Sequence, residues 1–183
     1  MSLNRIRNIA FLSTYPPREC GLATFTQDLV RALDKTAFLV KPKVVAVSNN
    51  AYIYGERVIA ELWQHDRESY IKTADAVNNS DFELLVVEHE YGIFGGEAGE
   101  YILGLVDNLK IPIVTTLHTV LPSPTEKQRE VLRVLGQKSA RVVAMAKNTK
   151  SILENVYGID PSKMEFIHHG VPYRLLETRD KLK

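Results

Sequence analysis

The sequence predicts an α/β domain with a doubly wound, mostly parallel sheet and helices on both of its faces. Short apolar runs alternate along the chain with segments of helical periodicity, almost without exception. The apolar runs, such as "VVAV" and "LLVV", are continuous, which is typical of strands that are covered on both sides. A length of 183 residues suits one domain of this class and is short for two.

Each strand is predicted from an apolar run that ends in polar or turn-forming residues. The run at 58–62 is short and predicts only a minor strand. The expected strands cover residues 9–12, 42–48, 58–62, 83–88, 111–118, 140–146 and 163–168.

Each helix is predicted from apolar residues spaced three or four positions apart. The third is expected to start near Glu97, and Ser123-Pro124 is expected to start the fourth, because proline suits a first helical turn. Gly158 is the expected C-cap of the fifth. The expected helices cover residues 22–33, 70–77, 98–109, a segment around 131–135, and 148–157.

The composition narrows the class of protein. Hydrophobic residues make up 45% and charged residues 25%, as in ordinary soluble globular proteins, and a net charge of +1 gives no reason to expect a nucleic-acid partner. One cysteine excludes an internal disulfide framework and fits a reducing compartment, so we expect a cytoplasmic location. No apolar run approaches the ~20 residues of a membrane span, and no signal peptide is expected.

Residues with binding chemistry follow the predicted strands. Ligands of open parallel sheets bind beyond the carboxyl ends of the strands. The loops expected at this edge include "TYPPRECGLAT", "EHEYGIFGGEAG", "HTVLPSP" and "HHGVP", whereas turns at the other edge, such as "NNSDFE", are plain. We therefore expect a binding site at this edge. The competing explanation is that loops after strands are simply longer and more varied.

A single glycine, Gly21, precedes the first helix. A dinucleotide-binding turn needs G-x-G-x-x-G and an acidic residue ending the second strand, but that strand ends in Ser48-Asn49-Asn50. A nicotinamide dehydrogenase is therefore disfavoured. The free N–H groups of the helix N-terminus can still face a phosphate, with Gly21 allowing close approach, or Gly21 is only a turn residue.

Two further loops carry candidate site residues. Glu88, His89 and Glu90 are consecutive, and burying several carboxylates is costly, so Glu90 is expected to face solvent or a polar ligand such as a sugar hydroxyl. His118 ends a strand, where it can hydrogen-bond a ligand or exchange a proton, or serve as a structural cap. The histidines lack a short metal-ligand spacing such as HExxH, so no metal is expected.

Four segments together resemble a known family. "ECGLATFTQDLVRAL" resembles a glycine-containing first loop and helix, "VVEHEYGIFGG" an H-x-H-Y-type loop, "TTLHT" a T-x-H-x strand end, and "FIHHGVP" a closing "IPNGVD" segment. In this order, from about Asn8 to Pro172, they resemble the N-terminal domain of retaining glycosyltransferases of family four, which have the GT-B fold. The chain departs from the family in having Cys20-Gly21 in place of two glycines and Glu90 in place of a histidine.

The resemblance implies a domain assignment and roles for individual residues. Residues 4–172 would form the acceptor-side domain, and 173–183 would begin a linker to a missing C-terminal, donor-binding domain. The backbone at Gly21 and Leu22 would approach the donor diphosphate. His118 would contact the transferred sugar or the acceptor hydroxyl near the reacting centre, and Glu90 and Tyr91 would line the acceptor side.

The function that the resemblance implies is that of the acceptor-binding half of a retaining glycosyltransferase. The full enzyme would move a hexosyl group from a nucleotide-sugar co-substrate to a carbohydrate or lipid-linked hydroxyl acceptor, without a cofactor, and this fragment alone would be inactive. Contact with the inner membrane face stays open: segment 123–141 is basic and amphipathic, but a solvated helix face explains it equally well.

Three alternatives stay open. The first is a stand-alone sugar- or nucleotide-binding module without catalysis. The second is the disfavoured nicotinamide-dependent oxidoreductase. The third is a glycosidase that uses Glu90 and Glu97 as its carboxylate pair, and it ranks low because nothing in the sequence fixes their separation.

Overall fold

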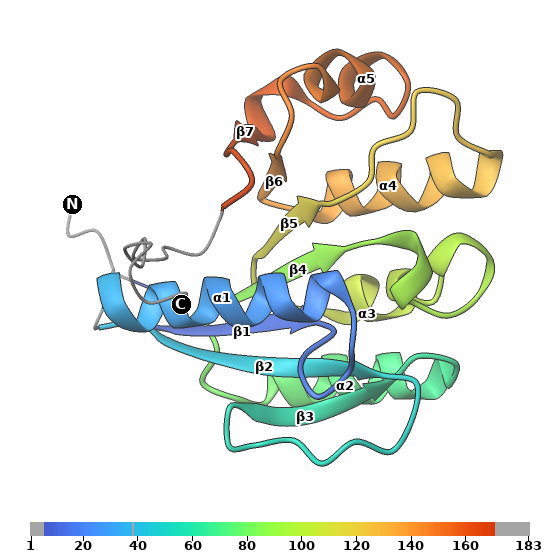
Figure 1. Cartoon of the computed structure of the whole chain (residues 1–183). Coiled ribbons are helices and arrows are strands. Elements are labelled where there is room, and N and C mark those ends of the chain that lie inside the picture. The colour runs from blue at the N-terminus through green and yellow to red at the C-terminus, as the bar shows by residue number, and fades with distance from the viewer. Residues whose placement is uncertain (1–5, 38, 171–183) are drawn as a thin grey trace, which may run out of the picture.

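A computed structural model describes residues 6–37 and 39–170. These residues form a seven-stranded sheet in the order β3-β2-β1-β4-β5-β6-β7, and each neighbouring pair is parallel (Figure 1). The predicted parallel sheet is therefore confirmed. The expected linker at 173–183 lies outside the described residues. The strands are β1 (Asn8–Ser13), β2 (Lys41–Ser48), β3 (Val58–Trp63), β4 (Leu84–His89), β5 (Ile113–Leu117), β6 (Arg141–Ala144) and β7 (Met164–Phe166).

Helices connect most of the strands and cover both faces of the sheet. In Figure 1, α1 lies in front of the sheet, while α2 and α3 lie behind it. The connection from β2 to β3 contains no helix and returns along the sheet as an extended loop. The α-helices are α1 (Gly21–Thr36), α2 (Arg67–Asn78), α3 (Ile102–Asn108), α4 (Glu126–Lys138) and α5 (Thr149–Asn155), and the 3₁₀ turns are η1 (Tyr91–Ile93), η2 (Glu97–Gly99) and η3 (Pro161–Lys163).

The core is divided by the sheet, because successive side chains of a strand point to opposite faces. Phe11, Val44 and Ala46 pack under α1. Their neighbours Leu12 and Val45 point the other way, into a larger cluster shared with α2, α3 and α4. A third cluster joins α4 and α5 to β5 and β6. The two faces therefore bury different sets of side chains from the same strands.

Two predicted helix starts are wrong. The third α-helix begins at Ile102 rather than near Glu97, because Ala98 adopts a left-handed backbone (φ 53) that limits the preceding residues to a short 3₁₀ turn. The fourth begins at Glu126, since Thr125 and Gln128 form a reciprocal capping box there. The predicted C-cap of the fifth helix is also displaced: α5 ends at Asn155 with Val156 as its C-cap, and Gly158 has a left-handed backbone (φ 65) in the turn that follows.

Helix α4 uses its apolar face inside the domain. Val131, Leu132 and Leu135 are fully buried in the core, so packing explains the amphipathic pattern of this segment. None of the helices in the described ranges combines the length and the apolar composition that crossing a bilayer requires.

Tyr70 on α2 fixes the loop after β4 to the end of β3. Its hydroxyl donates to the backbone oxygen of Gln64 and accepts from the N–H of Gly95, each at 2.8 Å. The ring is fully buried, and burial raises the pKa of Tyr70 to about 12. The close approach of these two loops leaves no room for a side chain at position 95. A Cβ on Gly95 would overlap the carbonyl oxygen of Gln64 and lie 2.7 Å from Tyr101 Cδ2.

We predict that Gly95→Ala lowers the free energy of unfolding by about 2 kcal/mol, because the added methyl group must push apart two backbone segments. Gly92→Ala is the matched control in the same loop, since nothing lies within 4 Å of its Cβ position. Urea unfolding of both variants measures the difference, and equal stabilities would contradict the close packing described at Gly95.

Candidate functional site

The carboxyl ends of β1, β4 and β5 lie side by side and carry the loops that the sequence singled out. β4 pairs with β1 on one side and with β5 on the other. Residues 14–20, 90–101 and 118–125 therefore leave the sheet at one edge (Figure 1). This is the edge at which doubly wound sheets bind their ligands.

Strand alternation separates the two residues that end β4. Val86 packs with the cluster under α1, whereas Leu85 and Val87 belong to the cluster on the opposite face. By the same alternation, Glu88 points toward the α1 side and His89 toward the other. Both side chains are fully buried, so the consecutive residues that the sequence presents as one group enter two different environments.

Glu88 and His118 form a buried pair. Glu88 Oε2 lies 2.8 Å from His118 Nε2, and the Glu88 side chain has no exposure to solvent. An ionised carboxylate only accepts hydrogen bonds, so when Glu88 is ionised Nε2 of His118 carries the proton and donates it. The other carboxylate oxygen, Oε1, has no hydrogen-bond partner among the described residues. His118 is therefore the one group that satisfies this buried carboxylate in the described structure.

The position of the His118 ring is fixed from three sides. Its backbone N–H donates to the His89 carbonyl oxygen at 3.0 Å, which continues the β4–β5 pairing past the end of the strand. Phe25 of α1 packs edge-to-face on the imidazole, with ring centroids 4.8 Å apart. With Glu88 holding Nε2, 13% of the side chain stays exposed, and Nδ1 has no hydrogen-bond partner within the described residues. The ring can therefore offer Nδ1 to a ligand.

His89 lies in an apolar environment on the other face. Its ring stacks on Phe94 at 5.9 Å and meets Tyr91 edge-on at 5.1 Å. Neither ring nitrogen has a hydrogen-bond partner among the described residues. Burial, with a smaller contribution from His118, lowers the pKa of His89 to about 3, so this imidazole is neutral near pH 7.

Glu90 and Tyr91 hold the loop that follows β4 in place, through hydrogen bonds and core packing respectively. Glu90 Oε1 accepts from the Tyr91 backbone N–H at 2.9 Å, and Oε2 accepts a short hydrogen bond from Thr119. Glu90 therefore joins the second loop to the third and is half-buried. The Tyr91 ring packs in the third core cluster with its hydroxyl 3.4 Å from that of Tyr157, and burial raises its pKa well above the usual value. The structure does not bring this side chain to the edge.

The start of α1 is capped by a residue that sequence analysis missed. Cys20 Sγ accepts from the Ala23 N–H at 3.4 Å and lies 3.1 Å from Thr14 Oγ1. Nothing lies within 4 Å of the Cβ position of the exposed Gly21, so neither space nor backbone conformation in this chain requires a glycine there. The Leu22 side chain packs on the core, which leaves only its backbone for a ligand.

The Arg18 side chain stabilises the loop after β1 through hydrogen bonds to two neighbouring segments. Its guanidinium donates to the Val47 carbonyl oxygen at 3.0 Å and to Gln64 Oε1 at 3.1 Å. Gln64 in turn donates from Nε2 to the Gly92 carbonyl oxygen at 3.0 Å. The loops after β1, β3 and β4 are thus joined by one chain of hydrogen bonds.

The remaining histidines do not join the buried pair as a cluster. His169 contacts Phe25, with ring centroids 5.0 Å apart, and His168 packs on Phe166. Among residues 6–37 and 39–170, no three His, Cys, Asp or Glu side chains gather closely enough to hold a metal ion.

The sheet order, the loops at one edge and the buried carboxylate–histidine pair define a Rossmann-like α/β domain of the type found as the N-terminal half of GT-B glycosyltransferases. The profile of the family described as Glycosyltransferase Family 4 matches residues 20–174. The chain therefore belongs to glycosyltransferase family 4, and the resemblance noted from its four segments is confirmed.

Solved structures share the fold. A glycosyltransferase from Rickettsia africae ESF-5 matches with a TM-score of 0.59 at 16% identity, over 90% of this chain and 44% of its own. HepE of Anabaena, solved with UDP and glucose, matches with a TM-score of 0.56 at 12% identity, over 90% and 45%. An alpha-glucosyltransferase, solved with UDP and a 13-mer DNA containing a central A:G mismatch, matches with a TM-score of 0.54 at 14% identity, over 77% and 37%.

The chain spans less than half the length of each of these three structures. At sequence identities of 12–16%, the similarity to these three structures shows a shared fold alone. No curated protein sequence matches the chain.

We predict that replacing His89 changes how stability depends on pH. Between pH 6.5 and pH 3 the unfolded chain binds a proton on this histidine and the folded chain does not, so the free energy of unfolding falls as the pH falls. At pH 5 this effect amounts to about 2 kcal/mol. His89→Phe removes it, so the variant should gain about 2 kcal/mol relative to the wild type between pH 7.5 and pH 5 in urea unfolding. A difference that is the same at both pH values would contradict this.

We predict that Glu88→Gln allows the His118 ring to populate both of its neutral tautomers. The carboxylate requires a proton on Nε2, whereas an amide can donate or accept at the same position. Two-bond proton–nitrogen NMR correlations should show the Nε2–H form alone in the wild-type ring and a mixture in Glu88→Gln. Exposed Glu97→Gln is the matched control and should leave the His118 pattern unchanged. A mixture already present in the wild type would show that Glu88 does not select the tautomer.

Proposed function

We propose that this chain is the acceptor-binding half of a retaining glycosyltransferase, which moves a sugar from a nucleotide-sugar donor to a hydroxyl acceptor. Membership of glycosyltransferase family 4 supports sugar transfer in general. The observation that carries the more specific proposal is the Glu88–His118 pair, because it holds an imidazole in a defined tautomer at the edge where this fold binds ligands.

His118 is proposed to contact the reacting sugars. Its Nδ1 accepts a hydrogen bond from a sugar hydroxyl while Nε2 is held by Glu88. Glu88 does not meet the ligand in this proposal and acts as a positioning residue. Such a contact places one hydroxyl in line with the reacting carbon. It therefore accelerates the transfer through orientation as well as through charge.

The donor diphosphate is proposed to meet the open start of α1. Gly21 is exposed, with nothing within 4 Å of its Cβ position, and backbone N–H groups at a helix N-terminus favour an anion. Titration of the chain with UDP and GDP against NAD tests this part, and the missing G-x-G-x-x-G pattern favours the sugar nucleotides over NAD.

Positive charge for the leaving diphosphate is proposed to come from a second domain. Within segments 14–20, 90–101 and 118–125 the sole lysine or arginine is Arg18, and its guanidinium is engaged with Val47 and Gln64. A departing nucleoside diphosphate needs cationic or metal partners. Solved structures of the fold extend well beyond the length of this chain, which supports such a domain. The rival proposal, a sugar- or nucleotide-binding module without catalysis, needs no such charge.

We predict that His118→Gln in the complete gene product lowers turnover about 100-fold, since a positioned polar group near the reacting centre typically contributes that much. Glutamine is chosen because its amide can still donate to Glu88, whereas His118→Ala would leave a buried carboxylate without its partner and destabilise the fold. Transfer from UDP-glucose and GDP-mannose to a panel of saccharide acceptors, followed by mass spectrometry, measures turnover and the anomeric outcome.

Lys72→Gln on the exposed face of α2 is the control and should keep wild-type turnover. Equal turnover of His118→Gln and Lys72→Gln would remove His118 from the site. A product of inverted anomeric configuration would overturn the retaining mechanism, and binding of nucleotide without any transfer would favour the non-catalytic module.

A further inference from the structure

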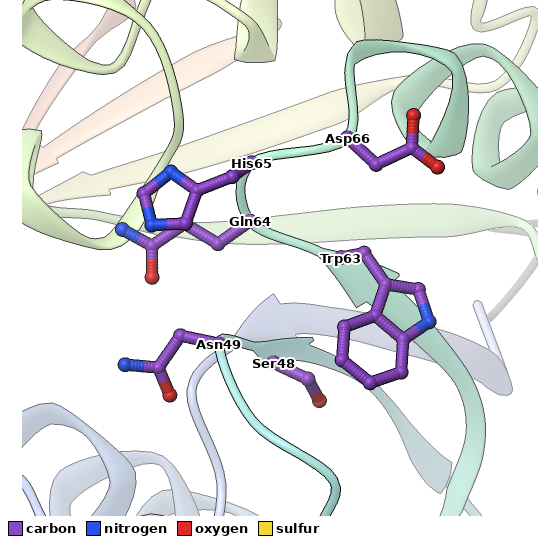
Figure 2. A pocket seen from close by; sticks show the side chains of 6 residues that line it. All are labelled: Ser48, Asn49, Trp63, Gln64, His65 and Asp66. Carbon is purple, nitrogen blue, oxygen red and sulfur yellow. The ribbon is translucent and has the colours of Figure 1, made fainter.

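A hollow opens at the same edge of the sheet, at the carboxyl ends of β2 and β3. It has a volume of about 470 Å³ (Figure 2). Ser48 and Trp63 are register partners on the two strands, so the floor of the hollow is continuous sheet. None of its residues belongs to the pair formed by Glu88 and His118. The lining side chains are those of Ser48, Asn49, Trp63, Gln64, His65 and Asp66.

Trp63 supplies the apolar part of this hollow. The indole is 43% exposed, although tryptophan is a side chain that proteins otherwise bury to a large extent. An exposed aromatic ring beside polar side chains provides a flat surface onto which the C–H face of a sugar ring can pack. In Figure 2 the indole lies on one side of Ser48, and the side chains of Asn49, Gln64 and His65 lie on the other.

The polar side chains of the hollow offer both kinds of hydrogen bond. Asn49 uses its oxygen to accept from the Tyr52 hydroxyl at 2.9 Å, which leaves its amide N–H groups as donors. Asp66 caps α2 through Oδ1, which accepts from the Glu68 N–H at 3.0 Å. Its Oδ2 takes no hydrogen bond from the described residues and is an acceptor for a ligand. Sugar hydroxyls donate and accept at once, so they match this set.

The walls of the hollow are fixed before any ligand arrives. Gln64 is nearly buried, its N–H donates to the Ser48 carbonyl oxygen at 2.8 Å, and its own carbonyl oxygen accepts from the buried Tyr70 hydroxyl. Its side chain connects Arg18 of the first loop with Gly92 of the loop after β4. The hollow is therefore rigidly connected to the loops of the first site.

We propose that this hollow is a carbohydrate-binding subsite that holds a sugar unit of an extended acceptor, away from the unit that receives the transferred sugar. The role of this sugar as part of an acceptor rests on the proposed function, whereas the binding of a sugar in the hollow does not. β3 lies three strand spacings from β4, which at about 4.8 Å each is roughly 14 Å. A ligand that occupies both sites is therefore an oligosaccharide rather than a monosaccharide.

A lipid surface is the competing ligand for an exposed tryptophan. The observations favour sugar because the other five residues that line the hollow are polar, and because the Asp66 carboxylate would be repelled by an anionic bilayer. Vesicles are therefore included in the test as the opposing outcome.

The sequence supplies its own probe, since Trp63 is the single tryptophan of the chain. The experiment follows its fluorescence while maltotriose, cellotriose and mannotriose are added separately to this chain, and then vesicles of equal parts phosphatidylcholine and phosphatidylglycerol. We expect a saturable change with at least one trisaccharide and none with vesicles. No response to any trisaccharide, or a response to vesicles alone, overturns the proposal.

Two variants that keep Trp63 make the test specific. Asp66→Asn preserves the helix cap but removes the charge, so it should weaken trisaccharide binding about tenfold. Ile71→Ala changes an exposed apolar residue of α2 outside the hollow and should bind as the wild type does. Equal affinities for Asp66→Asn and the wild type overturn the subsite. Saccharide binding without sugar transfer by the complete gene product would overturn the proposed function and leave the subsite proposal intact.

Discussion

Parallel pairing of β4 with β5 is the constraint from which the site follows. The register sets Glu88 beside Thr116 and His89 beside Leu117, so the residue after β5 meets the residue that ends β4. The His118 N–H bonds to the His89 carbonyl oxygen, and its ring returns to Glu88 on the α1 face. A carboxylate that would be costly to bury alone gains a hydrogen bond to Oε2 in this way, and the imidazole is fixed in place.

The loops at this edge are braced against one another through side chains. Gln64 connects the first loop to the loop after β4, Tyr70 connects the latter to the end of β3, and Glu90 connects it to Thr119. Polar groups held this way need little reordering when a ligand binds. The guanidinium of Arg18 is used for this bracing, and that is why the proposed transfer reaction calls for charge from another domain.

Two buried groups at the end of β4 lack full hydrogen bonding in the described structure. One is Glu88 Oε1, and the other is the His89 ring, whose pKa falls because burial disfavours its charged form. Unsatisfied buried polar groups reduce stability, and proteins tolerate them mainly where function requires them. They lie at the end of β4, next to the partly exposed imidazole of His118 and at the edge that carries the candidate site.

The sequence by itself determined the sheet, its parallel sense and the edge that carries the candidate site, because continuous apolar runs and helical spacing are local patterns. It also singled out His118, Gly21 and Glu90 as candidates, since polar and turn-forming residues after strands are visible without coordinates. Tertiary structure alone decided that Glu88 meets His118 and that Phe25 packs on that ring, because those contacts join distant segments. It also turned Tyr91 into the core and Trp63 toward solvent, since packing of neighbouring elements decides which side chains stay exposed.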